Sequence, residues 1–325
     1  MNPTSRTTLG TTTVPVTRLG LGTAPLGGWP ERMSIDDGLA TVRAAWDLGI
    51  RYFDTAPFYG YGQSERWIGE VLREEPRASF TLSTKMGRLL VETEDEPELY
   101  AGDHRHTAVF DFSYDGARRS LEESLERLGL DRVDVALIHD PDDALDEALD
   151  GTYRALHDMR AEGTVGAIGA GMNWTQPLVY LASRAEFDCV LLAGRYTILE
   201  QHALDDLLPL AIEQQFSIIA GGVFNSGVIV DPDVSAMYNY EPAPDDVIAR
   251  ARRIHEVCRR HDVDPRAAAL QFPLAHPAVA TVVSGARTPA EIESSTALMA
   301  TPIPEDLWQE MAVEGLVDER APLPS

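Results

Sequence analysis

Short apolar runs alternate with amphipathic stretches along most of the chain. Eight of these runs are rich in aliphatic or β-branched residues and short enough to be buried strands. They are Leu19–Gly22, Tyr52–Asp54, Phe80–Lys85, Val133–His139, Ala167–Ala170, Cys189–Leu192, Ser217–Ala220 and Thr281–Ser284. Strands that alternate with helices form parallel sheets, and eight strand–helix units in 325 residues fit a closed (β/α)₈ barrel, or TIM barrel.

The stretches between these strands carry helix start and stop signals. Ser34 is placed to cap a helix, and Gly49 is placed to end it. Thr288, with Pro289 at the first helical position and Glu291 three residues after the cap, has the pattern of a capping box. A doubly wound sheet is the alternative fold, but no G-x-G-x-x-G motif follows the first predicted strand. The barrel is therefore the favoured architecture.

Three segments lie outside the eight units. The N-terminal stretch TTLGTTTVPVTRLG has the pattern of a small hairpin, which we expect to close the bottom of the barrel. The connections 86–113 and 221–243 are longer than a barrel needs, and long loops in compact domains are often functional. Both follow strands, so we expect them at the C-terminal face, where barrel active sites lie. Residues 1–325 should form a single barrel domain.

Composition narrows the class of protein and its partners. The chain has 44% apolar and 24% charged residues, which is typical of a soluble globular protein. No apolar run approaches the ~18 residues of a membrane span, and the N-terminal stretch lacks the apolar core of a signal peptide. We therefore expect a cytoplasmic protein. The net charge of −25 argues against nucleic acids and anionic membranes as partners. Cys189 and Cys258 suggest neither a disulfide framework nor a metal site. The sequence leaves open whether the protein is a monomer or a small homo-oligomer.

The basic residues are almost all arginine, and Lys85 is the single lysine. A single lysine retained by chance could lie anywhere in the chain, whereas Lys85 lies at the end of a predicted strand. Arginine cannot supply the compact point charge of an ammonium, so this position has a specific requirement. Asp54 and His139 end neighbouring predicted strands, and Tyr59 lies just after one. We therefore expect these four side chains to converge on the C-terminal rim of the barrel.

Such a cluster suits proton transfer by a phenol. The pKa of free tyrosine is about 10. An ammonium ~4 Å away, at an effective dielectric of ~20, favours the phenolate by about 4 kcal/mol, or roughly three pK units, before desolvation. Asp54 would hold Lys85, and His139 would orient the substrate oxygen. Moving a proton on or off an alcohol or carbonyl oxygen accompanies hydride transfer, although a strand-end lysine beside a tyrosine also suits a Schiff-base aldolase.

Four stretches resemble the aldo-keto reductase superfamily in order and spacing: FDTAPFYGYGQSERWIGEVL, STKMG, LIHD and SGARTPAEIESS. The resemblance implies a (β/α)₈ barrel that binds NAD or NADP without a Rossmann fold and without a metal. It also implies a catalytic tetrad at Asp54, Tyr59, Lys85 and His139. A non-catalytic nucleotide sensor, like the channel subunits similar to this family, remains an alternative.

The resemblance further implies a cofactor site that follows several strands. Residues after the first, second and fifth strands approach the nicotinamide half, those after the seventh clamp the pyrophosphate, and those after the eighth hold the adenosine half. They are Gly22, Thr23, Asp54, Asn173, Phe224, Asn225, Ser226, Gly227, Ser284, Gly285, Arg287, Glu291 and Ser295. Glu291 would repel the 2′-phosphate of NADP, which favours NAD, whereas Arg287 favours NADP.

Some positions depart from the family pattern. Gly171, Met172, Ala193 and Gly221 stand where the family usually holds the carboxamide and the ring face of nicotinamide. The stretches LLAGRYTILEQ and GGVFNSGVI resemble a branch that contains dehydrogenases of L-fucose (D-threo-aldose), L-galactose and pyridoxal.

This branch of the family implies oxidation of a cyclic aldose, a ring hemiacetal, to a lactone. Tyr59 would take the proton of the anomeric hydroxyl. Oxidation of pyridoxal and general reduction of aldehydes or ketones remain alternatives, so the expected partner is a small sugar or aldehyde.

Overall fold

Eight parallel strands form a closed barrel in the computed structural model, which describes residues 1–95, 99–101, 105–234, 237–239 and 241–324. The strands are β3 (Leu19–Gly22), β4 (Tyr52–Asp54), β5 (Thr81–Met86), β8 (Val135–His139), β9 (Ala167–Met172), β10 (Cys189–Ala193), β11 (Ser217–Gly221) and β14 (Val279–Gly285). Their order around the barrel is β10-β11-β14-β3-β4-β5-β8-β9. All eight predicted strands are confirmed, and no end differs by more than two residues.

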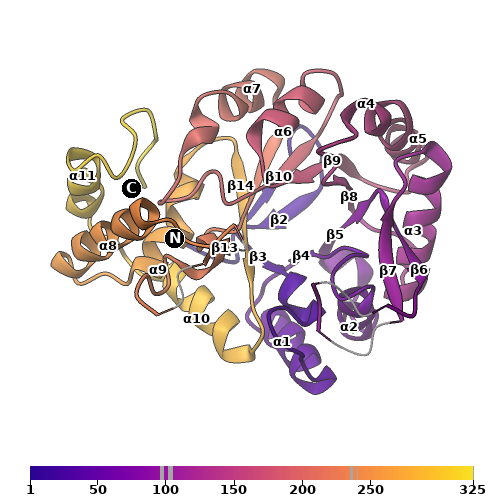
Figure 1. Ribbon diagram of the computed structural model, residues 1–325, viewed down its shortest axis with the longest axis horizontal. Coiled ribbons are helices and arrows are strands. Elements are labelled where there is room, and N and C mark those ends of the chain that lie inside the picture. The colour runs from indigo at the N-terminus through magenta and orange to yellow at the C-terminus, as the bar shows by residue number, and fades with distance from the viewer. Residues whose placement is uncertain (96–98, 102–104, 235–236, 240, 325) are drawn as a thin grey trace.

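Helices surround the strands (Figure 1). They are α1 (Ile35–Asp47), α2 (Gln63–Leu72), α3 (Tyr114–Leu128), α4 (Leu145–Ala148), α5 (Arg154–Glu162), α6 (Thr175–Ala182), α7 (Leu207–Gln214), α8 (Asp245–Arg260), α9 (Pro265–Gln271), α10 (Pro289–Ala300) and α11 (Glu305–Val313). The predicted caps are confirmed: Ser34 accepts a hydrogen bond from the backbone of Asp37, and Thr288 accepts one from Glu291. No helix within the described residues is long and apolar enough to cross a membrane.

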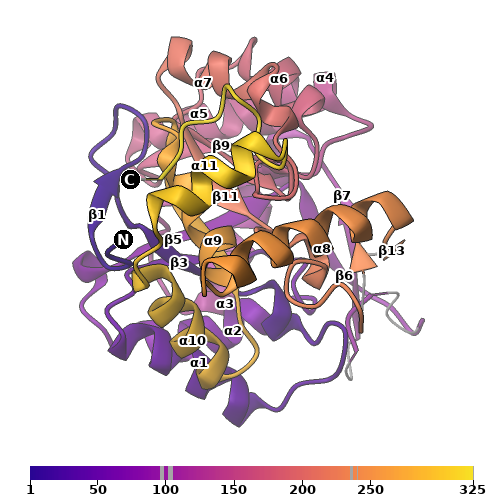
Figure 2. The ribbon, with the colours of Figure 1, turned by 90° about the vertical axis from the view of Figure 1, so that its left-hand side faces the viewer.

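An N-terminal hairpin closes one end of the barrel. Strands β1 (Arg6–Thr8) and β2 (Pro15–Thr17) pair antiparallel, and their neighbours Leu9 and Val14 share one apolar cluster with Tyr52 inside the barrel. In the side view of Figure 2, β1 lies at one end of the molecule and β6, β7 and β13 lie toward the other. The hairpin therefore covers the bottom, as predicted, and leaves the C-terminal face for the site.

Each long connection contains a short hairpin that the sequence analysis did not assign. In the first, β6 (Arg88–Glu92) pairs antiparallel with β7 (His106–Phe110). In the second, β12 (Met237–Tyr238) pairs with β13 (Glu241–Pro242). As far as the described residues show, each hairpin is a separate two-stranded sheet, and part of its surface is exposed. Its sequence therefore lacks the sustained apolar run of a barrel strand.

A buried ion pair fixes the second helix next to strand β5. The Glu65 carboxylate, fully shielded from solvent, accepts hydrogen bonds from Arg127 Nε of α3 at 2.6 Å and from Thr84 Oγ1 of β5 at 2.8 Å. Close helix contact accompanies it, because a Cβ on Gly69 would lie 2.2 Å from the carbonyl oxygen of Leu128. One carboxylate therefore connects α2, α3 and the strand that carries Lys85.

Glu65→Ala should destabilise the fold strongly. It leaves the mostly buried Arg127 guanidinium without its carboxylate, and breaking a buried ion pair costs about 3–5 kcal/mol. Urea unfolding followed by circular dichroism measures the change. Glu70→Ala on the same helix is the matched control, because its pair with Arg73 is exposed and should contribute little. Equal unfolding free energies for the two variants would contradict this assignment.

Candidate active site

Barrel register brings the four predicted side chains to one rim. Asp54 is the last residue of β4, Lys85 lies one residue before the end of β5, and His139 is the last residue of β8. These strands are neighbours, with Asp54 opposite Ser83 and Lys85 opposite Leu137. Tyr59 lies in the turn between β4 and α2, which a left-handed backbone at Gly60 and Gly62 keeps tight.

The ammonium of Lys85 is the centre of the cluster. It donates to Asp54 Oδ2 at 2.7 Å, to the carbonyl of Thr55 at 2.9 Å and to the hydroxyl of Tyr59 at 3.0 Å. An ammonium has three protons, and each has an acceptor here. The side chain is only 2% exposed, so its charge acts on the Tyr59 phenol with little screening by water.

Further hydrogen bonds, through Ser83 to Tyr52, fix the second carboxylate oxygen of Asp54. Ser83 Oγ donates to Asp54 Oδ1 at 2.7 Å and lies 3.0 Å from the hydroxyl of Tyr52. Burial raises the pKa of the Tyr52 phenol well above its usual value, and the Asp54 charge raises it further. Tyr52 therefore keeps its proton, and both oxygens of Asp54 have fixed donors.

His139 faces the phenol as a neutral ring. Its ring stands perpendicular to that of Tyr59, with centroids 5.9 Å apart. Burial lowers the pKa of His139 well below its ordinary value, and the charges of Arg88 and Lys85 lower it further. A neutral imidazole has one donor and one acceptor nitrogen, which suits contact with a hydroxyl or carbonyl oxygen. Within the described residues, the buried Nδ1 atom has no hydrogen-bond partner.

Two adjoining cavities open above this cluster. The first, of about 420 Å³, is lined by Tyr59, Lys85 and His139 together with aromatic side chains that include Trp29 and Phe58. The second, of about 380 Å³, runs past the ends of β10, β11 and β14. Both include Pro25, Trp29, Asn173 and Ala193 in their walls. They form one continuous site: a pocket at the tetrad and a groove beside it.

The groove has features that fit a dinucleotide. Asn225, Ser226 and Gly227 follow one another with φ of +47°, +57° and +100°, and such left-handed residues build backbone anion-binding concavities. Asn225 donates from Nδ2 to the carbonyl of Gly194 at 3.0 Å. Its Oδ1 atom is buried without a partner among the described residues, so a ligand donor fits there. Phe224, Ser284 and Gly285 complete this part of the groove.

Other predicted cofactor residues lie outside the walls of both cavities. Thr23 is buried and donates to the carbonyl of Asp54 at 2.8 Å, next to Gly22. Arg287 donates to the carbonyls of Trp29 and Glu31, both at 3.0 Å. The Glu291 carboxylate accepts a hydrogen bond from the backbone N–H of Arg287 at 2.7 Å. In a capping box the donor would be the N–H of the cap residue Thr288, so the observed donor lies one residue earlier. Ser295 Oγ lies 3.4 Å from Ser284 Oγ.

The positions that depart from the family pattern do lie at the site. Gly171, Met172 and Ala193 line the pocket, and a Cβ on Gly221 would meet Leu191 Cδ2 at 3.4 Å. No aromatic ring can project from position 221. The ring face of nicotinamide must therefore be held by other groups.

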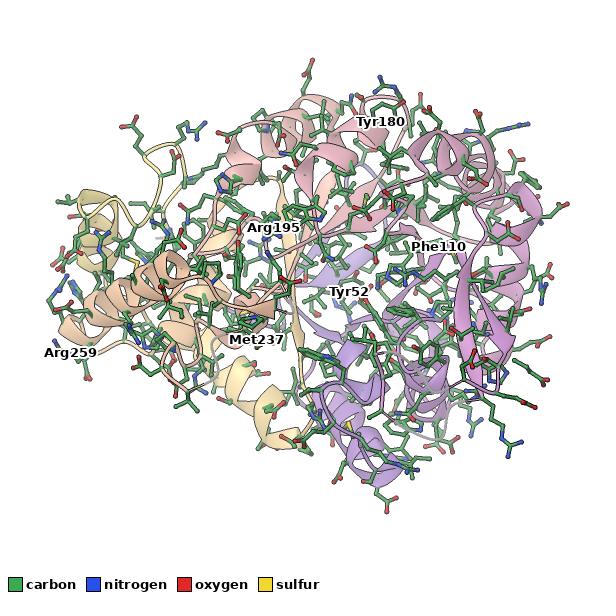
Figure 3. All side chains as sticks on the ribbon, in the orientation of Figure 1. Tyr52, Phe110, Tyr180, Arg195, Met237 and Arg259 are labelled. Carbon is green, nitrogen blue, oxygen red and sulfur yellow. The ribbon has the colours of Figure 1, made fainter. Side chains whose placement is uncertain are left out.

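Sequence reasoning missed three charged residues of the site. Asp140 lines the pocket, and Arg88 of β6 pairs with it at 2.8 Å. Arg195 lines the groove, stacks on Trp174 at 4.1 Å and pairs with Glu200 at 2.9 Å. In the view of Figure 3, Arg195 lies near the middle of the molecule. Arginine is common in this sequence, and no motif distinguishes these two arginines before their partners on other loops are known.

The fold is a closed parallel barrel, and a cluster of titratable side chains with an adjoining groove lies at the C-terminal ends of its strands. These features define a TIM-barrel enzyme. The chain belongs to the aldo/keto reductase family, whose sequence pattern matches residues 18–313. It is thus an NAD(P)-dependent oxidoreductase, and the predicted resemblance is confirmed.

Individual relatives agree with this assignment. The chain is 39% identical to a pyridoxal 4-dehydrogenase of Microbacterium luteolum, over 95% of this chain and 97% of the relative. It is 41% identical to a D-threo-aldose 1-dehydrogenase of a Pseudomonas species, over 92% and 94%. An aldo-keto reductase from Bacillus halodurans, solved in its holo form, has the same fold, with a TM-score of 0.78 at 23% identity over 99% and 98% of the two chains.

Lys85→Arg should remove most activity although it keeps the charge. The guanidinium is longer and planar, so it cannot donate to Asp54, Thr55 and Tyr59 from one atom. We expect kcat to fall by at least ~10²-fold and the pH optimum of oxidation to rise, because the phenolate loses its nearest cation. Fluorescence titration should show retained cofactor binding. Arg73→Lys, which makes the reverse exchange at an exposed pair, is the control; activity of Lys85→Arg within a few-fold of wild type would refute the assigned role.

Proposed function

We propose that this enzyme is a dehydrogenase that oxidises a cyclic aldose to its lactone, with Tyr59 as the acid–base residue. The observation that carries the proposal is the position of the Lys85 ammonium, 3.0 Å from the Tyr59 hydroxyl and 2.7 Å from Asp54 at the base of the pocket. A buried cation in contact with a phenol lowers the free energy of the phenolate, which is the form that accepts a proton.

Each side chain of the cluster then has a defined task. The anomeric hydroxyl of the sugar binds between Tyr59 and His139, and Tyr59 removes its proton. His139, neutral and perpendicular to the phenol, makes a second hydrogen bond to the same oxygen and fixes its direction. Lys85 stabilises the phenolate, and Asp54 holds Lys85. The groove at Asn225–Gly227 would hold the nicotinamide cofactor, which would supply the acceptor for the hydride of C1.

The shape of the pocket agrees with a single sugar ring. A volume of about 420 Å³ lies within the range of small-molecule sites, and aromatic walls pack against the C–H faces of a ring. A relative at 41% identity bears the name of an aldose dehydrogenase, which adds support. The relative named for pyridoxal makes pyridoxal the second candidate substrate, since both substrates present a ring hemiacetal or an aldehyde.

Schiff-base catalysis by Lys85 fits the geometry poorly. An attacking amine must be neutral and have a free lone pair. Here the nitrogen donates to three acceptors within hydrogen-bond distance, one of them a buried carboxylate, so no lone pair faces the pocket. Borohydride reduction in the presence of a carbonyl substrate should leave Lys85 unmodified.

The substrate class is tested by one screen. Aldoses, pyridoxal and simple aldehydes are incubated with NAD+, NADP+ or their reduced forms, and the absorbance of the reduced nicotinamide is followed. We expect oxidation of aldoses to give the highest kcat/KM. Higher kcat/KM for pyridoxal would favour the second candidate, and cofactor binding without turnover of any compound would favour a sensor.

Tyr59→Phe should abolish most turnover without disturbing the fold. The substitution removes one oxygen and leaves the ring, so cofactor affinity should stay near wild type. The expected fall in kcat is ~10²–10⁴-fold, the usual contribution of a positioned acid–base group. Steady-state kinetics and fluorescence titration measure the two effects. Tyr52→Phe is a structural comparison that removes a phenol behind Asp54; turnover retained in Tyr59→Phe would assign the proton to another group.

NAD should be preferred over NADP. Arg287 donates its guanidinium to loop carbonyls, and the exposed Glu291 carboxylate stands beside it at the start of α10. Glu291→Gln keeps the capping hydrogen bond but removes the charge, so we expect the NADP+/NAD+ ratio of kcat/KM to rise roughly five- to tenfold, as for about 1 kcal/mol of exposed repulsion. Glu293→Gln, exposed on the same helix, is the control and should leave the ratio unchanged. A wild-type preference for NADP+ would refute the prediction.

A further inference from the structure

The pocket contains a carboxylate that the proposed proton transfer does not use. Of the described residues that line it, Asp140 alone carries a carboxylate. It directly follows His139 and has a left-handed backbone, with φ of +45°. A non-glycine residue in this conformation is uncommon, although aspartate and asparagine tolerate it best. The backbone thus turns sharply at the point where β8 ends and brings this side chain to the pocket wall.

Asp140 is paired with Arg88, and two aromatic rings fix the position of the Arg88 guanidinium. Arg88 Nη2 donates to Asp140 Oδ2 at 2.8 Å. The Arg88 guanidinium lies over the ring of Phe58 at 4.1 Å and over that of Phe110 at 4.6 Å, measured to the ring centroids. Figure 3 shows Phe110 on the side of the molecule that carries β6 and β7. Burial raises the pKa of Asp140, and the charge of Arg88 opposes that rise.

The position of Asp140 relative to His139 indicates what it can reach. Asp140 Oδ2 lies 3.5 Å from His139 Nε2. If His139 contacts the oxygen on C1, Asp140 lies next to the substituent of the adjacent ring atom. Both described contacts of Asp140 use Oδ2, so Oδ1 is the oxygen left to face a ligand.

We propose that Asp140 accepts a hydrogen bond from the C2 hydroxyl of the aldose and so selects sugars over aldehydes that lack this group. The inference rests on the proposed aldose oxidation and deepens it. A neutral hydroxyl suits the site better than a cation, because Asp140 is already paired with Arg88 and the cationic Lys85 also lines the pocket. A ligand without the hydroxyl leaves Oδ1 of this partly buried carboxylate without a donor, while Oδ2 keeps its pair with Arg88. An oxygen left without a donor in this way costs more than the lost contact alone.

The test compares two sugars in two enzymes. L-fucose and 2-deoxy-L-fucose differ only in the C2 hydroxyl, and Asp140→Asn removes the charge while asparagine still fits the left-handed backbone. In the wild type we expect kcat/KM to fall roughly 10²-fold from L-fucose to its 2-deoxy analogue, because hydrogen bonds to charged groups discriminate strongly. In Asp140→Asn the two sugars should differ by only a few-fold.

Controls separate recognition from damage to the site. Asp143→Asn, exposed on the same loop, should keep the wild-type ratio between the sugars. Cofactor binding by Asp140→Asn, followed by fluorescence, reports that the variant is folded. The inference is overturned if Asp140→Asn keeps the wild-type discrimination, or if it lowers kcat/KM equally for both sugars, since Asp140 would then act through His139. If the wild type oxidises no 2-hydroxyaldose with either cofactor, the proposed function fails first and this inference with it.

Discussion

A buried ammonium imposes the arrangement of the whole site. Taking the Lys85 charge out of water costs several kcal/mol, and only close and well-directed acceptors compensate it. The structure supplies a carboxylate from β4, a carbonyl from the following turn and the phenol of Tyr59. Asp54 is in turn fixed by Ser83, which lies against Tyr52. A phenol in contact with this cation is therefore held in place by the same contacts that stabilise the charge.

The two ends of the barrel have different roles: the bottom contributes stability, and the top carries the active site. At the bottom, the N-terminal hairpin packs apolar side chains against the interior residues. On the outside, the buried pair of Glu65 and Arg127 connects α2 and α3 to β5, one residue before Lys85. At the top, by contrast, three buried polar atoms without partners among the described residues belong to side chains that line the cavities: His139 Nδ1, Asn225 Oδ1 and Arg195 Nε. Unsatisfied polar atoms are unfavourable in a core and are typical of a surface built to meet a ligand.

Chain order explains why sequence reasoning succeeded with the barrel and its rim. In a parallel barrel, consecutive strands are neighbours and all end on one face, so Asp54, Lys85 and His139 had to approach one another once their strands were identified. The loops offer no such rule. Arg88 meets Asp140 and Arg195 meets Trp174 across separate connections, and these contacts depend on how far long side chains reach. Arg287 shows the same difficulty, because its guanidinium contacts the carbonyls of residues 29 and 31, a loop that precedes α1.

The long connections contribute to different parts of the site. Leu99 and Tyr100 of the first line the pocket, and its hairpin supplies Arg88 to Asp140. The second contributes Phe224–Gly227 and Asn239 to the groove, and its Tyr238 contacts Arg195. The contacts of the Lys85 ammonium come from β4 and the turn that follows it, whereas Arg88 of the first hairpin acts on His139 through its charge. The described residues of the first connection line the pocket, and those of the second line the groove. Changes in the first connection can therefore alter substrate recognition while the groove and the contacts of Lys85 keep their geometry.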